Sequence, residues 1–139
     1  MRQIFVDTSA WDAMADSQDT HHELALLFRQ EIAGRGAQLV VTDYVLDELY
    51  TLLLLNIGYQ GAVSFKNKLD TLVQEGVVFV VWVTKPIVQE AWEVFERFNV
   101  DKNWSFTDCV SFVVMKQRKM TEAFTFDHHF QQMGFAKLP

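Results

Sequence analysis

Four acidic residues spread along the chain are the residues of this sequence best suited to chemistry. Each follows or begins a short segment with the composition of a strand or a helix, and they are Asp7, Glu48, Asp108 and Asp127. A fold that brought them together would form a cluster of carboxylates. Like charges repel at close range, and a divalent cation bound by oxygen ligands removes that repulsion. The four acids therefore predict a metal site, provided that the fold unites them.

Each acid also has a purely structural explanation when it is taken alone. Asp7 could cap a short helix, and Asp108 stands three residues after Ser105 in an arrangement close to a capping box. Asp127 could occupy a turn or a cap after a strand. Glu48 is harder to explain in this way, because its helix is apolar on nearly every side and a buried unpaired carboxylate is costly. The joint occurrence of the four acids favours a shared site.

Strand-like and helix-like segments alternate along the chain and predict the elements that position these acids. The expected strands are rich in β-branched and aromatic residues and cover residues 4–6, 39–41, 77–83, 123–126 and 135–138. The expected helices carry apolar residues at helical spacing and cover residues 20–33, 42–56, 64–74, 87–98 and 105–120. This alternation predicts an α/β fold with three α/β/α layers and a mostly parallel central sheet of four to five strands.

The predicted topology indicates where the acids should lie. In folds of this kind the binding crevice opens beyond the carboxyl ends of the strands, and three of the four acids are sent to that edge. Residues 77–83 form a continuous β-branched and aromatic run. We therefore expect the strand in this segment to be buried on both faces.

The composition is that of an ordinary globular protein and limits its partners. The chain has 139 residues, half of them apolar, so we expect residues 1–139 to form one domain. Eighteen acids against twelve bases give a net charge of -6. Such a charge repels nucleic acid at long range unless a metal or a local basic strip reverses its sign.

The cysteine content and the short apolar runs indicate in which cellular compartment the protein is expected. The sole cysteine, Cys109, cannot form an internal disulfide, and the densest apolar stretches are far shorter than the roughly 20 residues that cross a bilayer. We therefore expect a cytoplasmic protein without a membrane segment. Cys109 has no evident His and Asn partners, so it is expected to pack as a small apolar residue.

Two pairs of adjacent histidines suggest a zinc site at first sight. They are His21 with His22 and His128 with His129. Adjacent histidines point to different sides of a helix, and no further cysteine or spaced histidine completes a tetrahedral set of ligands. We therefore do not expect zinc.

The basic and tryptophan residues each leave an alternative open. The basic run at residues 116–119 would place favourable charges in the last turn of a helix, or it could contact RNA phosphates. The four tryptophans are expected in the core or an interface. Trp11 and Trp104 also stand next to acidic motifs, where they could stack on a base.

The motifs around the acids resemble those of the PIN-domain family and, within it, of the VapC-type toxins of toxin–antitoxin pairs. The resemblance covers nearly the whole chain in order, through residues 5–9, 42–48, 104–109 and 125–130. It implies an α/β/α metal-dependent endoribonuclease. The catalytic and metal-binding acids that it implies are Asp7, Glu48, Asp108 and Asp127.

The resemblance also implies supporting residues. The small hydroxyl residues expected to steady the carboxylates are Thr8, Ser9, Thr107 and Thr125. Asp101 precedes the third motif, where it could assist or, more simply, occupy a turn.

The expected activity is hydrolysis of RNA with Mg²⁺ or Mn²⁺. Asp7 and Asp108 would hold the ion directly, while Glu48 and Asp127 would orient water or hold a second ion. The expected partners are the RNA substrate, a cognate antitoxin and a second copy of the chain. The homodimer is expected because the helix over residues 42–56 carries more leucines than one core-facing stripe needs.

Two alternative functions remain open at this point. One is a PIN nuclease of RNA processing that is not a toxin. The other is a catalytically silent binding module whose acids serve only as caps.

Overall fold

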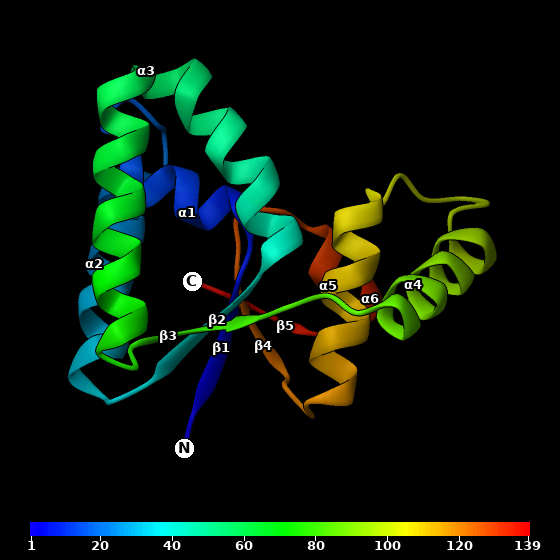
Figure 1. Ribbon diagram of the computed structural model, residues 1–139. Helices are drawn as coiled ribbons and strands as arrows, with labels where there is room; N and C mark the ends of the chain where they lie inside the picture. Colours follow the sequence, from blue (N-terminus) through cyan, green and yellow to red (C-terminus); the bar gives the residue numbers. More distant parts are fainter.

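The computed structural model describes residues 1–139 as one sheet flanked by helices (Figure 1). In chain order the strands are β1 (Gln3–Val6), β2 (Gln38–Thr42), β3 (Val78–Val81), β4 (Glu122–Phe124) and β5 (Ala136–Leu138). The helices are α1 (Thr8–Ala15), α2 (His22–Gly34), α3 (Asp43–Gln74), α4 (Lys85–Phe98), α5 (Phe106–Gln117) and α6 (His129–Met133). The predicted alternation is confirmed, with two short helices, α1 and α6, beyond the five that were expected.

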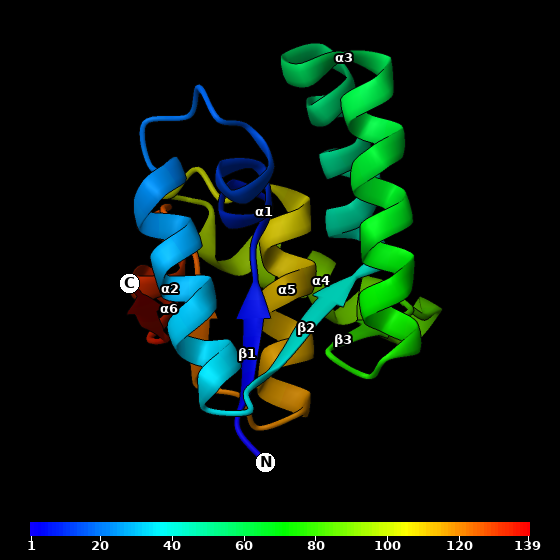
Figure 2. The same cartoon turned by 90° about the vertical axis from the view of Figure 1, so that its left-hand side faces the viewer.

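All five strands are parallel and lie in the order β3-β2-β1-β4-β5. From the central β1 the chain proceeds to β2 and β3 on one side, then returns to β4 and β5 on the other. Parallel sheets open a crevice at such a change of direction, outside the carboxyl ends of the strands. Figure 2 shows β1 pointing toward α1, which lies beyond that end of the strand.

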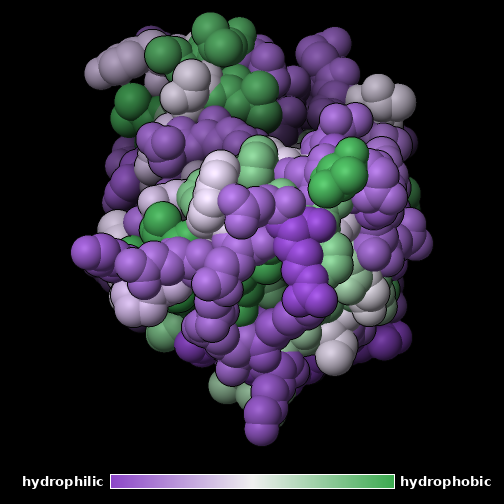
Figure 3. Space-filling model, turned by 90° about the vertical axis from the view of Figure 1, so that its right-hand side faces the viewer, coloured by the Kyte–Doolittle hydropathy of each residue, from purple (hydrophilic) through white to green (hydrophobic).

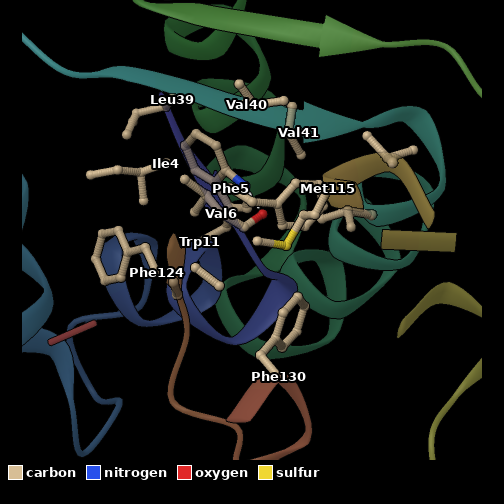
Figure 4. Close-up of a cluster of buried hydrophobic side chains, with 14 of the residues drawn as sticks. Ile4, Phe5, Val6, Trp11, Leu39, Val40, Val41, Met115, Phe124 and Phe130 are labelled. Carbon is tan, nitrogen blue, oxygen red and sulfur yellow. Dashed lines mark hydrogen bonds between the residues drawn. The ribbon is translucent and has the colours of Figure 1, made fainter. Parts of the chain in front are cut away.

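Helices cover the sheet on both sides, as the predicted α/β/α layering requires. In Figure 1, α2 and the second half of α3 lie to the left of the sheet, and α4, α5 and α6 lie to its right. Thirty-two buried apolar residues form one core cluster. Figure 4 shows side chains of β1, β2 and β4 meeting Trp11 of α1, Met115 of α5 and Phe130 of α6. Burying each large apolar side chain contributes roughly 1.5–3 kcal/mol.

Two of the four tryptophans lie in the core. The Trp11 indole N–H donates to the Val6 carbonyl at 3.1 Å, and the Trp104 indole N–H donates to Oε1 of Gln132 at 2.8 Å. Both side chains are buried. The expected core position is therefore confirmed, and the alternative in which these rings stack on a base is wrong.

The strand β3 differs from its prediction. It lies at the edge of the sheet with β2 as its only neighbour, and Phe79 is 41% exposed while Trp82, just after the strand, is 68% exposed. The expectation of burial on both faces is therefore wrong. A continuous apolar run does not reveal whether a strand is central or at an edge.

The two helices expected over residues 42–56 and 64–74 form one segment, α3, that bends at Gly58. This glycine has φ 83° and ψ 176°, a left-handed conformation that costs glycine little. The predicted cap is present, because Oγ1 of Thr42 accepts from the backbone N–H of Val45 at 3.1 Å. Figures 1 and 2 show the bend at the top of the molecule.

None of the helices combines the length and the apolar character that crossing a membrane requires.

Candidate active site

All four predicted acids line one open pocket of about 370 Å³ beyond the carboxyl ends of β1 and β4. Two further acids that the sequence analysis did not single out, Asp12 and Asp19, line it as well. The other lining residues are Thr8, Ser9, His21, Leu52, Asn103, Ser105, Phe126 and His129. No lysine or arginine is among them, so the pocket holds six carboxylates without a permanent cation.

The Asp7 carboxylate is held by hydroxyl groups from both strand ends. Its Oδ2 accepts from Oγ of Ser9 and from Oγ1 of Thr125, each at 3.0 Å. These hydroxyls in turn accept from the backbone N–H groups of Phe126 and Asp127, each at 3.0 Å. The position of Asp7 is therefore fixed to the ends of β1 and β4, as the resemblance implied for Ser9 and Thr125.

The other two hydroxyl residues implied by the resemblance do not steady a carboxylate through their side chains. Oγ1 of Thr8 is buried without a hydrogen-bond partner. Thr107 contributes only its backbone carbonyl, which accepts from Oγ of Ser111 at 3.0 Å.

Asp7 does not serve as a side-chain cap. It occupies the N-cap position of α1, yet its side chain makes no capping hydrogen bond. Burial raises the pKa of Asp7 from its ordinary 3.8 to about 7, and the charge of Asp108 adds to this rise, while hydrogen bonds from Thr125 and Ser9 oppose it. This carboxyl is therefore harder to ionise than an ordinary aspartate, and a nearby cation would favour its charged form.

Asp108 combines a cap with a free oxygen. The predicted capping box is present: Oγ of Ser105 accepts from the Asp108 N–H at 2.9 Å, and Oδ2 of Asp108 accepts from the Ser105 N–H at 3.1 Å. All the protein hydrogen bonds of this carboxylate use Oδ2. Oδ1 is left for a ligand, and burial raises the pKa of Asp108.

His129 joins two of the acids and was missed as a site residue. Its Nδ1 lies 2.9 Å from Oδ2 of Asp108 and 3.2 Å from Oδ2 of Asp127. The backbone N–H of His129 also donates to Oδ1 of Asp127 at 3.0 Å. Asp127 therefore forms the turn expected of it, and it also faces the pocket. The spacing of two residues between Asp127 and His129 was the only sequence signal for this contact.

Asp127, His128 and His129 each bring one potential metal-ligand atom within 4.8 Å of the others. The Nδ1 atoms of both histidines face Asp127, at 3.6 Å for His128 and 3.2 Å for His129. His129 is already engaged by carboxylates, and no cysteine joins the group. The oxygen-rich donor set of the pocket fits a hard cation such as Mg²⁺ or Mn²⁺ better than zinc.

Glu48 lies at the mouth of the pocket and is exposed. The expected burial of this carboxylate is wrong, because this face of α3 borders the open pocket instead of the core. Its carboxylate makes no hydrogen bond to the protein. It is therefore free to accept one from water or to bind a cation.

Three other candidates lie outside the pocket. Asp101 pairs with Lys102 at 3.0 Å on the surface. The basic run at residues 116–119 lies at the end of α5 opposite Asp108, roughly 12 Å along the helix, and the Arg118 guanidinium lies 4.8 Å from the centre of the Phe79 ring. This position favours the helix-end explanation of the basic run.

Cys109 is buried and burial raises its pKa to about 11, so the thiol stays protonated and packs in the core as expected.

A second hollow, of about 330 Å³, lies between α1, α2 and the second half of α3. Apolar side chains dominate its lining, and its charged members are Arg29 and Lys68. It contains no carboxylate, so it lacks the oxygen ligands that a hard cation needs.

Comparisons with known proteins agree with this geometry. The family model of the PIN domain matches residues 4–136. The 23S rRNA-specific endonuclease VapC20 of Mycobacterium tuberculosis is 32% identical over 136 residues, which cover 97% of each chain. A VapC ribonuclease of Archaeoglobus fulgidus is 29% identical over 116 residues, which cover 83% of this chain and 71% of the relative.

Solved structures show the same fold. The crystal structure of M. tuberculosis VapC20, a sarcin–ricin loop cleaving toxin, superposes with a TM-score of 0.83 at 31% identity over 97% of this chain and 98% of that one. VapBC2 from Rickettsia felis, bound to a promoter DNA fragment, shares the fold with a TM-score of 0.67 at 11% identity, covering 98% of this chain and 97% of that one. The chain therefore belongs to the PIN-domain family and, within it, to the VapC-type toxins.

Proposed function

We propose that this protein is an endoribonuclease that hydrolyses RNA phosphodiester bonds with Mg²⁺ or Mn²⁺ held in the acidic pocket. Ribonuclease activity is the activity named for its VapC relatives. The observation that carries the metal dependence is the buried Asp7 carboxylate, whose pKa rises to about 7 beside Asp108 in a pocket without a lysine or arginine. A divalent cation between these carboxylates would remove their repulsion.

Asp7 and Asp108 are the residues that would hold the cation directly. When bound, the cation would neutralise charge that builds on the phosphoryl oxygens and lower the pKa of water. Ser9 and Thr125 orient Asp7, while the capping box orients Asp108 with Oδ1 free. The protein therefore holds both carboxylates in place before any ligand binds.

The remaining two acids have different surroundings and different proposed roles. Asp127 is held beside Asp108 by His129 and would bind the cation or orient the attacking water. Glu48 is exposed and free of protein hydrogen bonds, so it can orient water, accept a proton or help to bind a second ion.

The first RNA to test is the sarcin–ricin loop of 23S rRNA. The M. tuberculosis relative named for cleaving it covers 97% of this chain at 32% identity. A pocket of about 370 Å³ that is open to solvent can admit a backbone phosphate from an exposed loop.

We also propose that a cognate antitoxin controls the enzyme, that residues 1–139 act as one nuclease domain in the cytoplasm, and that two copies form a homodimer. The apolar surface expected from the sequence is present near the bend of α3, where Leu55 is 77% exposed and Leu54 and Tyr59 are exposed as well. Figure 3 shows apolar residues gathered at the top of the molecule, where Figure 1 places this bend. Sedimentation at micromolar concentration should give twice the chain mass of 16.1 kDa.

Cleavage of a sarcin–ricin loop RNA with Mg²⁺, with Mn²⁺ and with EDTA tests the proposal directly. We expect cleavage only with added metal, and we expect millimolar Mn²⁺ to raise the melting temperature, because a ligand that binds only the folded state stabilises it. Both effects should be lost in Asp7→Asn and kept in the surface variant Asp101→Asn. Cleavage that persists in EDTA, or a melting temperature that Mn²⁺ leaves unchanged, would contradict the proposed metal site.

A further inference from the structure

Two aromatic rings from distant parts of the sequence stack at the wall of the acidic pocket. The imidazole of His21 lies on the ring of Phe126 with 4.4 Å between ring centres and 2° between ring planes. Both residues line the pocket that holds the four acids. His21 is nevertheless exposed. Phe126 is the only ring stacked on His21, so the opposite face of the imidazole has no aromatic partner in the protein.

The stack is held in place from both sides. The backbone N–H of His21 donates to Oδ1 of Asp19 at 2.8 Å, and its carbonyl accepts from the N–H of Ala25 at 2.9 Å, which fixes His21 at the start of α2. The backbone N–H of Phe126 donates to Oγ of Ser9, the same hydroxyl that donates to Asp7. The two stacked residues are therefore tied to the chain segments that carry Asp7 and Asp19.

A flat, preorganised ring beside a phosphodiester-cleaving pocket matches one ligand chemistry in particular. Every base has a π-face, so aromatic side chains bind single-stranded nucleic acid by stacking without depending on the sequence. The pocket itself is acidic and repels phosphate in the absence of a cation, so contacts with the bases would add affinity that the pocket alone does not supply. The ammonium group of Lys137, 5.8 Å from the centre of the Phe126 ring, adds a positive charge next to the stack.

We propose that His21, backed by Phe126, is the surface on which a base next to the scissile phosphate stacks. This inference rests on the proposed ribonuclease function. It assigns His21 a role in substrate binding, separate from the carboxylates that would hold the cation.

The experiment compares three variants of His21. His21→Phe keeps a flat ring, His21→Leu keeps a side chain of similar size without a π-face, and His21→Ala removes the side chain. Trp92→Leu is the matched control, because Trp92 is also an exposed ring stacked on a phenylalanine, Phe95, at 5.2 Å and 15°, but it lies on α4 outside the pocket.

Two readouts report on stacking. The first is the fluorescence of loop RNA that carries 2-aminopurine at successive positions, titrated with the protein in Ca²⁺, since stacking quenches this base. The second is the steady-state kinetics of cleavage in Mg²⁺, which give KM and kcat separately. We expect His21→Ala and His21→Leu to bind RNA about 5- to 150-fold more weakly, the usual cost of losing one stacked base. The weaker binding should appear mainly as a higher KM, and the 2-aminopurine at one position of the RNA should no longer be quenched.

His21→Phe and Trp92→Leu should retain the affinity and the quenching of the wild type. The rise of the melting temperature with Mn²⁺ should stay unchanged in all four variants, because none of them alters a carboxylate. Equal RNA binding by His21→Leu and the wild type would overturn the proposal. So would a loss in His21→Phe as large as that in His21→Ala, since it would show that a flat ring at this position is not enough for binding.

These outcomes are distinguishable from failure of the proposed function. If the wild type neither cleaves RNA with Mg²⁺ nor quenches the probe with Ca²⁺, the ribonuclease function fails, and the stacking surface fails with it. If the wild type cleaves with metal and the His21 variants match it, the stacking surface alone is wrong.

Discussion

The two ends of the β1–β4 pair carry opposite arrangements of charge. At the amino ends, Arg2 donates from Nε and Nη2 to the two carboxylate oxygens of Glu122 at 2.9 and 3.0 Å. At the carboxyl ends, Asp7 after β1 lies in one pocket with Asp127 after β4 and with Asp108, and no lysine or arginine lines that pocket. At the amino ends the carboxylate charge is neutralised by Arg2 of the protein itself. At the carboxyl ends a bound cation would have to neutralise the carboxylates.

The acid pKa values at the two ends move in opposite directions. The hydrogen bond from Arg2 lowers the pKa of Glu122, whereas burial, followed by the charge of Asp108, raises the pKa of Asp7. One pair of strands therefore carries a stabilising contact at one end and a destabilising cluster at the other. Clustered carboxylates with raised pKa values are typical of functional sites, because structural charges are usually paired.

The largest expected effect is loss of RNA cleavage at the carboxyl end alone. Asp7→Asn and Asp108→Asn should each lower kcat/KM by about 1,000-fold or more, because they remove proposed direct ligands, and residues that only orient such ligands already cost about 10- to 100-fold. Glu122→Gln, at the opposite end, should change kcat/KM by less than about 2-fold. The measurement is initial rates on one loop RNA with saturating Mn²⁺.

The double variant of Asp7 and Asp108 sharpens this test. Its loss should be close to that of either single variant, because one missing ligand already dismantles the site. Additive losses would show that the two acids act independently and would contradict a shared cation.

A smaller effect is expected at His129, which touches two acids. His129→Ala should weaken Mn²⁺ binding by about 10- to 100-fold, the usual cost of losing a residue that orients metal ligands. His129→Asn should recover part of the affinity, since its amide can still donate one hydrogen bond. Calorimetric titration of Mn²⁺ measures both. The control is His128→Asn, because His128 lies 3.6 Å from Asp127 and its side chain is 70% exposed. If His129→Ala bound Mn²⁺ as tightly as the wild type, the contacts of His129 with Asp108 and Asp127 would have no role in metal binding.

Local patterns were sufficient to predict most of the fold. The strand and helix segments follow from apolar spacing, and the caps at Thr42 and Ser105 follow from residue type and position. The edge position of β3 could not be predicted, because it depends on where other strands pair. The exposure of Glu48 escaped prediction for a similar reason: the apolar helix around it faces the core on one side and the pocket on the other.

The acids of the site were predictable because topology gathers the residues that follow parallel strands. The contacts between their neighbours were not. His129 reaches Asp108 across 21 positions, and His21 stacks on Phe126 across a much longer separation. Contacts of this kind depend on how α2, α5 and α6 pack around the strand ends, and a single sequence holds no local signal for that packing.

In the metal-free protein, removing the charge of Asp7 should increase stability. Asp7→Asn keeps an acceptor for Ser9 and Thr125 while it removes the buried charge, so we expect the free energy of unfolding in EDTA to rise by roughly 1–3 kcal/mol at about pH 8. Urea unfolding at several pH values measures the effect. A variant less stable than the wild type under these conditions would show that the Asp7 charge already has a partner in the protein.

The pH dependence of this gain has a definite sign. The pKa of Asp7 is about 7 in the folded state and 3.8 ordinarily. Between these values the folded state binds more protons than the unfolded state, so the wild type loses stability as pH rises through this window. The gain from Asp7→Asn should therefore be smallest near pH 4 and largest above about pH 7.

The smallest expected effect belongs to the amino end of the sheet and has the opposite sign. The Arg2 and Glu122 side chains are 34% and 28% exposed, so solvent screens their pair, and Glu122→Gln should lower the free energy of unfolding by only about 0.5–1 kcal/mol. Because the folded pKa of Glu122 is lowered from its ordinary 4.5, its contribution is present above that value and is lost as pH falls through the folded pKa. Molar salt should shrink the difference between Glu122→Gln and the wild type, since an exposed pair is screened. Urea unfolding of the wild type, Glu122→Gln and Asp7→Asn in parallel therefore compares the two ends of the strand pair. At about pH 8, Glu122→Gln should be less stable than the wild type and Asp7→Asn more stable. If both variants gained stability, the Arg2–Glu122 contact would not stabilise the fold.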